Sequence, residues 1–239
     1  MFRKSSKHRD LSTAQNSFGP NLGFLSREAY NAIRTNLTLT MHHKDQGGRV
    51  VGITSPSPRD GKSYSSVNLA YALAKDGNRV LLINGDLRLP SLERYLNLSC
   101  KKGLSNYLCG DMDPEEGLPV VEHVLDVDLS VLAAGDIPPN PSELLGSSEM
   151  EELLKDVRQT YDFILIDLPP ISSVIDAIAV SPYMDGIILV VRQGHTHKRA
   201  IRETMSNLNL SGTRLLGFIV NDYAPSAAHK YLYNHTYYS

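Results

Sequence analysis

The sequence has few cysteines, no tryptophan and no long run of apolar residues. Its two cysteines, Cys100 and Cys109, form no Cys-x-x-Cys pair, and their spacing excludes a zinc site and a disulfide framework. Unpaired thiols are typical of a reducing compartment. No run reaches the roughly 18 apolar residues that a membrane span requires, and no apolar segment follows the basic N-terminus as in a signal peptide. We therefore expect a cytoplasmic protein without a direct membrane span.

The net charge is small as well. The 24 basic and 26 acidic residues give −2 over 239 residues, which excludes a global field that would attract nucleic acid or acidic lipid. The basic cluster in the first ten residues is interpreted as a solvated arm, with contact to an anionic membrane as the alternative. Hydrophobic residues (41%) and charged residues (21%) are near the globular average, which excludes a disordered, collagen-like or coiled-coil chain.

The chain divides into an arm, one domain and a tail. Residues 1–25 lack periodicity and are predicted to be a flexible, extended arm, residues 26–222 form the domain, and residues 223–239 are a tyrosine-rich tail. Apolar residues four positions apart predict a first helix with Ser26 as its N-cap. We expect strands at 49–55, 79–85, 127–135, 162–167, 186–192 and 214–222, and helices at 61–76, 148–159, 174–183 and 197–209.

The apolar runs predict the fold class. Most of them, including the last run LLGFIV, are apolar on consecutive positions, as in strands that are covered on both faces. Together with the repeated strand–helix order, this predicts an α/β domain with a doubly wound, mostly parallel sheet flanked by helices, like that of P-loop NTPases. Ligands of such sheets bind beyond the carboxyl ends of the strands, so the residues that follow each strand carry the functional information.

A candidate phosphate-binding loop follows the first predicted strand. Gly61-Lys62-Ser63 lies between that strand and a helix, where backbone N–H groups face an anion, the lysine reaches the β- and γ-phosphates, and the serine binds Mg²⁺. We expect nucleotide contacts from Pro58, Arg59, Asp60, Gly61, Lys62, Ser63 and Tyr64. Pro56 stands where the strict pattern has glycine, which keeps an ordinary strand-to-helix turn as the alternative.

Two carboxylates follow buried runs. Asp86 comes after the second predicted strand, and Asp167 ends the run FILID. Carboxylates in such positions next to a phosphate loop hold Mg²⁺ or its waters. A turn residue or a helix cap is the structural alternative for each.

The motifs together resemble one family. SxxPxDGKS, LLIxxDxRxP and FILIDxPP occur in this order within residues 26–222. They resemble the cytoplasmic tyrosine kinases of bacterial capsule and exopolysaccharide synthesis, which are related to the MinD and ParA ATPases with a deviant Walker motif. The resemblance implies ATP and Mg²⁺ as cofactors and phosphoryl transfer to tyrosines, largely between subunits. It implies a catalytic site of Lys62, Asp86, Asp167, Arg88 and Asn84, with the metal at Ser63, Asp86 and Asp167.

The tail carries the family's tyrosine cluster. Tyr231, Tyr233, Tyr237 and Tyr238 are four of the 12 tyrosines and lie in the last nine residues. We predict that they are phosphoacceptors, because four tyrosines in a polar tail beyond the last strand cannot all be packing residues. If extended, residues 223–239 would span up to about 55 Å, enough to reach the site of an adjacent subunit.

Two residues near the expected chemistry depart from the family pattern. Asn84 stands where the second motif has its first aspartate, and asparagine can neither take a proton from a hydroxyl nor add negative charge near Mg²⁺. If that carboxylate activates the tyrosine, the chain is a slow kinase or a nucleotide-binding pseudokinase. If it only orients a metal-bound water, Asn84 is tolerated. An engineered substitution at position 84 is a further alternative. Arg59 replaces a usual glycine, which would fit if its φ angle is negative.

The resemblance also implies an assembly. Glu28 and Arg34 on the first helix are expected to contact a neighbouring subunit of a homo-oligomer, although the middle charge of the family's motif is replaced by Asn31. A solvated helix face is the alternative. A transmembrane polysaccharide co-polymerase adaptor is expected to recruit the kinase to the inner face of the membrane, where it would regulate polymerisation and export.

Three further positions receive weaker assignments. Asn221, near the end of the last strand, is expected to contact adenine, with a turn as the alternative. Asp176 is expected to assist the metal or a phosphate-sensing loop. His195 and His197 have no carboxylate or cysteine patterned around them, which argues against a metal site.

Two other functions stay open. A switch ATPase of the MinD/ParA type predicts a lysine near the start of the loop, where Ser55-Pro56-Ser57 has none, and it leaves the tyrosine tail unexplained. A nucleotide-binding pseudokinase that acts as a scaffold is the non-enzymatic alternative, on the ground of Asn84.

Overall fold

The structure is a computed structural model that describes residues 18–41, 47–112, 117–171 and 176–223. Its strands are β1 (Arg49–Thr54), β2 (Val80–Asn84), β3 (Val120–Val121), β4 (Leu129–Leu132), β5 (Phe163–Asp167), β6 (Gly186–Arg192) and β7 (Leu215–Asn221). Within the described residues they form one seven-stranded sheet in the order β3-β4-β2-β5-β1-β6-β7, in which only β3 and β4 pair antiparallel. The predicted α/β fold with a mostly parallel sheet is confirmed.

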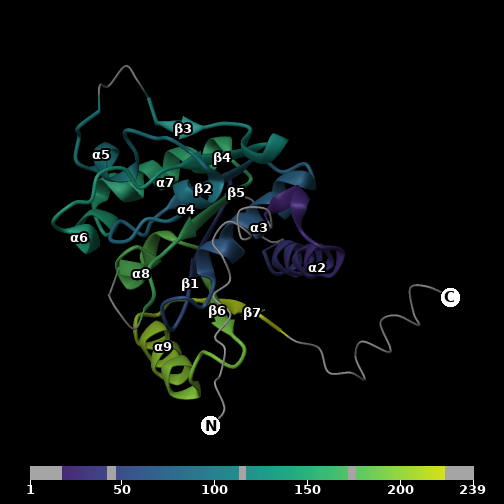
Figure 1. The fold of residues 1–239 in the computed structure, drawn as a ribbon. Helices are drawn as coiled ribbons and strands as arrows, with labels where there is room; N and C mark the ends of the chain where they lie inside the picture. The colour runs from purple at the N-terminus through teal and green to yellow at the C-terminus, as the bar shows by residue number, and fades with distance from the viewer. Residues whose placement is uncertain (1–17, 42–46, 113–116, 172–175, 224–239) are drawn as a thin grey trace, which may run out of the picture.

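Helices cover both faces of the sheet (Figure 1). They are α2 (Phe24–Thr40), α3 (Lys62–Lys75), α4 (Leu92–Leu96), α5 (Leu104–Leu108), α6 (Pro141–Leu145), α7 (Ser148–Thr160), α8 (Asp176–Ala179) and α9 (Lys198–Leu210), with 3₁₀ turns η1 (Gly19–Asn21), η2 (Val124–Asp126) and η3 (Ser181–Tyr183). No helix in the described ranges combines the length and the hydropathy that crossing a bilayer requires.

Two hydrophobic cores explain the consecutive apolar residues of the central strands. The first core joins one face of the sheet to α2, α3 and α4, and the second joins the other face to α5, α6, α7, α8 and α9. Along β5, Phe163 and Leu165 belong to the first core, whereas Ile164 and Ile166 belong to the second. Each central strand therefore needs apolar side chains on both faces.

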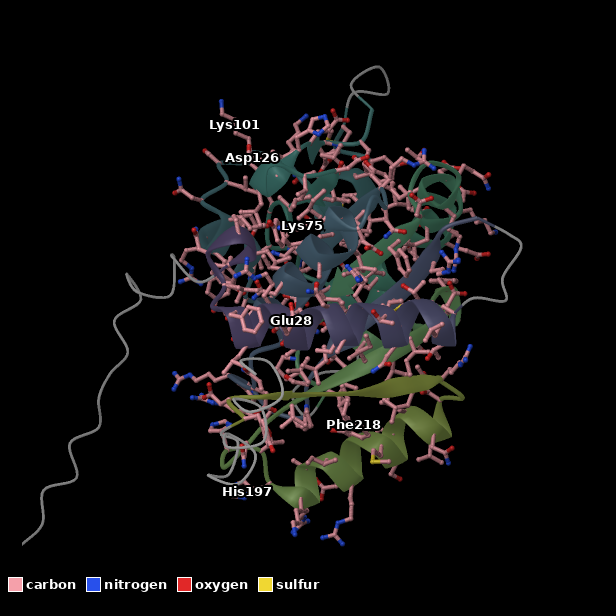
Figure 2. All side chains as sticks on the ribbon, turned by 90° about the vertical axis from the view of Figure 1, so that its right-hand side faces the viewer. Glu28, Lys75, Lys101, Asp126, His197 and Phe218 are labelled. Atoms are coloured by element: carbon pink, nitrogen blue, oxygen red, sulfur yellow. The ribbon has the colours of Figure 1, made fainter. Side chains whose placement is uncertain are left out.

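The edge strand β7 differs from this pattern. Ile219 is 5% exposed, but its neighbours Phe218 and Val220 are 44% and 53% exposed. Figure 2 labels Phe218, which lies near α9. The prediction that this run is covered on both faces is wrong, because a strand at the edge of the sheet pairs on one side only and has fewer elements packed against it.

The first helix also begins earlier than predicted. α2 starts at Phe24 with Gly23 as its N-cap and no side-chain cap, so the prediction of Ser26 as N-cap is wrong. Phe18 and Leu22 are buried in the first core, where the Phe18 ring packs against Tyr64 at 5.2 Å between centroids. Residues 18–25 of the predicted arm therefore belong to the folded domain.

Most other predicted elements end within three residues of the observed ones. The predicted helix at 174–183 is α8 followed by η3 in the residues that the structure describes. The structure adds β3, which the sequence did not predict because two residues show no periodicity.

A partly buried ion pair lies at the amino end of the sheet. Asp185, just before β6, accepts a hydrogen bond from the Val50 N–H of β1 (2.9 Å) and pairs with Arg158 Nη1 of α7 (2.9 Å). Arg158 also donates to the carbonyl oxygens of Gly48 (2.6 Å) and Tyr183 (3.2 Å). These bonds join β1, α7 and the segment before β6 at one point.

We expect Asp185→Ala to lower the free energy of unfolding by about 2–3 kcal/mol, because the Val50 N–H and the partly buried Arg158 guanidinium lose their shared acceptor. Glu203→Ala, which breaks the exposed Arg199–Glu203 pair on α9, is the control and should leave that energy nearly unchanged. Urea unfolding followed by circular dichroism measures both variants. Equal losses in the two would contradict the anchoring role of Asp185.

Candidate functional site

The predicted phosphate loop lies at the carboxyl edge of the sheet. β1 ends at Thr54, residues 55–61 form the loop, and α3 begins at Lys62. Gly61, the N-cap of α3, has a left-handed backbone (φ +97°) and, as a glycine, has no side chain to cap this helix. A helix N-terminus without a side-chain cap presents backbone N–H groups and the positive end of the helix dipole, which together attract anions such as phosphate.

Three charged side chains meet at this helix N-terminus. Lys62 Nζ lies 2.9 Å from Asp86 Oδ2 and 3.4 Å from Asp167 Oδ2. The three side chains are 12%, 6% and 0% exposed, respectively. They meet because β5 pairs in parallel with both β2 and β1, so that the segments following these strands start side by side. The structure thus brings together the lysine and the two carboxylates that the sequence predicted.

Hydroxyl groups complete the surroundings of Asp167. Ser63 donates to Asp167 Oδ2 (2.6 Å), and Ser66, one turn further along α3, donates to Oδ1 (3.0 Å). Ser91, just before α4, donates to Ser63 Oγ (3.2 Å). The sequence analysis missed Ser66 and Ser91. The three-residue spacing from Ser63 could have indicated Ser66, because such residues share a helix face.

Burial and pairing shift the pKa values of this cluster. Burial opposes the charge of Lys62, but the attraction of Asp167 and Asp86 outweighs it and raises the pKa of the ammonium. Burial raises the pKa of Asp167, although Lys62 and Ser63 act in the opposite direction. Two carboxylates against one ammonium leave an excess of negative charge in a dry site, which a bound cation would offset.

The buried side chain of Asp60 holds the loop through hydrogen bonds. It is fully buried, and its carboxylate accepts hydrogen bonds from the Ser57 N–H (2.9 Å) and the Thr196 hydroxyl (2.7 Å). His195 Nδ1 lies 3.0 Å from Asp60 Oδ1. The carboxylate predicted to contact nucleotide is thus engaged by groups of the protein, and it ties the loop to the connection between β6 and α9. Among the described residues, no three His, Cys, Asp or Glu side chains form a group that could hold a metal.

The remaining loop residues take different positions. Pro58 and Arg59 are exposed, whereas Tyr64 packs on Phe18. Arg59 has a φ angle of +66°, so the condition under which arginine would fit here without strain, a negative φ, is not met. This region strains a residue that has a Cβ atom by about 1–2 kcal/mol and favours glycine. Arg192 Nη1 donates to the Arg59 carbonyl oxygen (3.4 Å) and helps to hold this conformation.

Asn221, predicted to contact adenine, lies against the loop. Its Nδ2 donates to the Asp60 carbonyl oxygen (3.0 Å), and its Oδ1 accepts the Asp222 N–H (2.9 Å). A Cβ atom added at Gly61 would lie 1.9 Å from Asn221 Nδ2. The positive φ therefore favours glycine at position 61, and a larger residue there would also displace the Asn221 amide.

Arg88 and Asp176, predicted separately, form a pair. Arg88 donates to Asp176 Oδ2 from Nε (2.8 Å) and to Oδ1 from Nη2 (3.1 Å). Asp176 is fully buried at the start of α8 and also accepts a short hydrogen bond from the Ser142 hydroxyl of α6. The pair joins the segment after β2 to α6 and α8, and it engages the carboxylate that was expected to assist the metal.

Asn84 is fully buried at the end of β2 and has an acidic partner. Its Nδ2 lies 3.0 and 2.9 Å from the two carboxylate oxygens of Glu93 on α4. The sequence analysis missed Glu93. Nothing in the local pattern marks it, apart from its place in the first turn of the helix that follows the second motif.

Two sets of predicted residues are not part of this cluster. Glu28 and Arg34 lie on α2, the helix that crosses the middle of Figure 2, where Glu28 is labelled. Glu28 accepts a hydrogen bond from the Asn31 amide (3.1 Å), and Arg34 pairs with Asp76 of the same chain (3.0 Å). Contact with a neighbouring subunit therefore stays a prediction. The tail tyrosines, Tyr231, Tyr233, Tyr237 and Tyr238, lie outside the described residues.

Sequence comparisons identify relatives of the whole domain. A family model for an AAA domain matches residues 58–210. The tyrosine-protein kinase YwqD of Bacillus subtilis is 37% identical over 197 residues, which cover 82% of this chain and 81% of YwqD. The tyrosine-protein kinase Ptk of Acinetobacter johnsonii is 34% identical over 201 residues, which cover 84% of this chain but only 27% of Ptk.

Solved structures share the fold. The kinase domain of the Escherichia coli tyrosine kinase ETK superposes with a TM-score of 0.80 at 29% identity and covers 94% of this chain and 87% of the ETK chain. The septum site-determining protein MinD of Pyrococcus horikoshii, in complex with Mg-ADP, superposes with a TM-score of 0.61 at 25% identity and covers 77% of each chain. The likeness to ETK is thus closer and extends over more of the chain.

We expect Gly61→Ala to lower the melting temperature more than Gly77→Ala. Both glycines have a left-handed backbone (φ +97° and +88°), so alanine is strained by about 1–2 kcal/mol at either position. The added Cβ atom has nothing within 4 Å at position 77 but meets Asn221 at position 61. Differential scanning fluorimetry measures both variants. Equal losses, or no recovery when Asn221→Ala is added to Gly61→Ala, would contradict the steric role of Asn221.

Proposed function

The chain belongs to the family of bacterial tyrosine-protein kinases, and from this premise we propose that it binds ATP and Mg²⁺ and transfers the γ-phosphoryl group of ATP to tyrosine hydroxyls. One observation carries the proposal. The Lys62 ammonium contacts the carboxylates of Asp86 and Asp167 at the N-terminus of α3, whose N-cap is a glycine without a capping side chain. Phosphoryl transfer needs these parts in one place: an anion cradle, a fixed positive charge and carboxylates for a metal ion.

The roles follow from the atoms that each residue presents. The backbone N–H groups at the start of α3 and the Lys62 ammonium would bind phosphate oxygens. The Ser63 hydroxyl and the carboxylates of Asp86 and Asp167 would hold Mg²⁺, because oxygen donors suit this ion and the cluster has an excess of negative charge. When bound, Mg²⁺ would neutralise charge that develops on the phosphate oxygens. Positioning and charge neutralisation would then supply most of the rate.

The tail tyrosines are the proposed acceptors. β7 runs parallel to β6, so its carboxyl end lies at the same edge of the sheet as the loop, and Asn221 at that end contacts the loop directly. The chain continues from Tyr223 into the tail segment with its four tyrosines. We assign the transfer largely to the tail of a neighbouring subunit in a homo-oligomer, to which Glu28 and Arg34 would contribute.

The proposed setting is polysaccharide synthesis. A transmembrane polysaccharide co-polymerase adaptor would recruit this cytoplasmic kinase to the inner face of the membrane. Phosphorylation of the tail would there regulate the polymerisation and export of capsular polysaccharide or exopolysaccharide. Membership in the family supports this assignment.

A switch ATPase is the second candidate, which the likeness to MinD with Mg-ADP favours. It leaves the tyrosine cluster without a role, and the segment Ser55-Pro56-Ser57 lacks the lysine that such a loop would carry. A nucleotide-binding scaffold without activity is the third candidate, on the ground of Asn84.

Intact-mass spectrometry of the full chain after incubation with ATP and Mg²⁺ tests the proposal. We expect stepwise additions of phosphate to the tail, and a rate lower by about 100-fold for Lys62→Met, because a fixed charge at the phosphates is lost. Lys75→Met, at the other end of α3, is the control and should be phosphorylated like the unmodified chain. ATP hydrolysis without a change in mass would support the switch ATPase, and nucleotide binding without either would support the scaffold.

We further expect the phosphorylated protein to form smaller assemblies than the same protein after phosphatase treatment. Each phosphotyrosine adds about −1.5 to −2 charges, which the carboxylates of Asp86 and Asp167 would repel from a neighbouring site. Mass photometry of the two forms at equal concentration measures the difference. Identical size distributions would contradict a link between tail phosphorylation and disassembly.

A further inference from the structure

A carboxylate on α4 holds the amide of Asn84 in place. Asn84 Nδ2 lies 3.0 Å from Glu93 Oε1 and 2.9 Å from Oε2. Glu93 Oε1 also accepts the Ala134 N–H, from the segment after β4, at 2.7 Å. These hydrogen bonds fix the carboxylate across the ends of the adjacent strands β2 and β4.

The amide of Asn84 connects Glu93 to Asp86. A carboxylate accepts hydrogen bonds and does not donate, so Glu93 requires Nδ2 of Asn84 to face it and leaves Oδ1 for another donor. That donor is the Asp86 N–H, at 3.3 Å. Asp86 in turn pairs with Lys62 at 2.9 Å. A continuous chain of contacts therefore runs from Glu93 to the centre of the site.

The position of Glu93 is set independently of Asn84. Leu92, the preceding residue on α4, is fully buried in the first core, and Ser91 donates to Ser63 Oγ (3.2 Å). α4 is thus held both by the core and by the start of α3. Its acidic residue reaches the end of β2 because of this packing, and Asn84 meets a carboxylate that is already there.

We propose that Asn84 and Glu93 form a single functional unit, the Asn84–Glu93 pair, in which Glu93 carries the negative charge that the family pattern has at position 84 and orients Asp86 through Asn84. Glu93 is then a positioning residue of the reaction, and the inference rests on the proposed function. An aspartate at position 84 would set two carboxylates at the roughly 3.0 Å now occupied by the amide contact, where two acceptors repel. Asn84 is the residue that fits Glu93, rather than a lost catalytic group.

Exchanging the two groups tests the pair. In the double variant Asn84→Asp/Glu93→Gln, the amide at position 93 would donate to the carboxylate at position 84, and its oxygen would accept the Ala134 N–H. The second oxygen at position 84 would accept the Asp86 N–H. Every hydrogen bond of the pair thus keeps a donor and an acceptor, with the charge moved from α4 to β2. Asn84→Asp alone sets acceptor against acceptor.

Two readouts report the orientation of Asp86. We expect Asn84→Asp to lower kcat for tail phosphorylation by at least about tenfold with a smaller change in KM for ATP, because the groups that would bind the phosphates, Lys62 and the start of α3, are not substituted. We also expect it to raise the Mg²⁺ concentration for half-maximal binding of a fluorescent ADP analogue by about threefold or more. The double variant should return both quantities to within about threefold of the unmodified chain.

A second asparagine–carboxylate contact provides the control. Asn106 Nδ2 donates to Asp136 Oδ2 at 2.8 Å, next to α5. Asn106→Asp creates the same clash of acceptors there, and Asn106→Asp/Asp136→Asn is the corresponding exchange. We expect Asn106→Asp to lower the melting temperature but to leave kcat and the Mg²⁺ dependence unchanged at a temperature where the variant is folded.

Several results would overturn the pair. One is an Asn84→Asp variant that is as active as the unmodified chain, and another is a double variant with a kcat no higher than that of Asn84→Asp. A third is that the changes in melting temperature without ligand, caused by Asn84→Asp and Glu93→Gln alone, add up to the change in the double variant. If Asn84→Asp does not fold, a folded double variant supports the pair and an unfolded one overturns it. If the unmodified chain binds the ADP analogue but phosphorylates nothing, the proposed kinase function is refuted and the Asn84–Glu93 pair is not. The Mg²⁺ dependence of binding and the melting temperatures of the variants then still test whether the two residues act as a pair.

Discussion

The Lys62 ammonium contacts the carboxylates of Asp86 and Asp167. This contact requires the carboxyl ends of β1, β2 and β5 to lie at the same edge of the sheet. Parallel pairing of β5 with β1 on one side and β2 on the other meets this requirement, and the two hydrophobic cores hold these strands between helices. A buried charge without a partner is unfavourable by several kcal/mol. The strand order of the sheet therefore brings the three charged groups together. Their mutual attraction offsets the unfavourable free energy of burying them.

The connections around this cluster are fixed by polar contacts rather than by regular structure. Asp60 ties the loop to the segment between β6 and α9, Asn221 supports the same loop from β7, and the Arg88–Asp176 pair ties the segment after β2 to α8. The carboxylates of Asp60 and Asp176 and the amide of Asn221 all make hydrogen bonds within the protein. In the proposed function, the N-terminus of α3 would face the ligand, and these contacts hold the loop before it in a frame that would need little rearrangement to bind an anion.

The Asn84–Glu93 pair changes the meaning of a departure from the family pattern. Read alone, Asn84 indicates a missing carboxylate and a weakened enzyme. In the structure a carboxylate is present nonetheless, on α4, and the asparagine is the group that can donate to it. An acidic residue at position 84 would suit a chain with a donor at position 93, and this chain has an acceptor there.

The sequence by itself determined the fold class, the strand-to-helix turn at Gly61–Ser63 and the carboxylates that lie beside it at the ends of two strands, because hydrophobic periodicity and short motifs are local properties. It misjudged Ser26 as an N-cap and the exposure of β7, and it left the φ angle of Arg59 open. All three depend on how a segment meets its neighbours. Only the tertiary structure decided which partner each polar side chain has, such as Glu93 for Asn84. Such partners lie on different elements, and strand order and helix packing, which no local pattern encodes, bring them within hydrogen-bond distance.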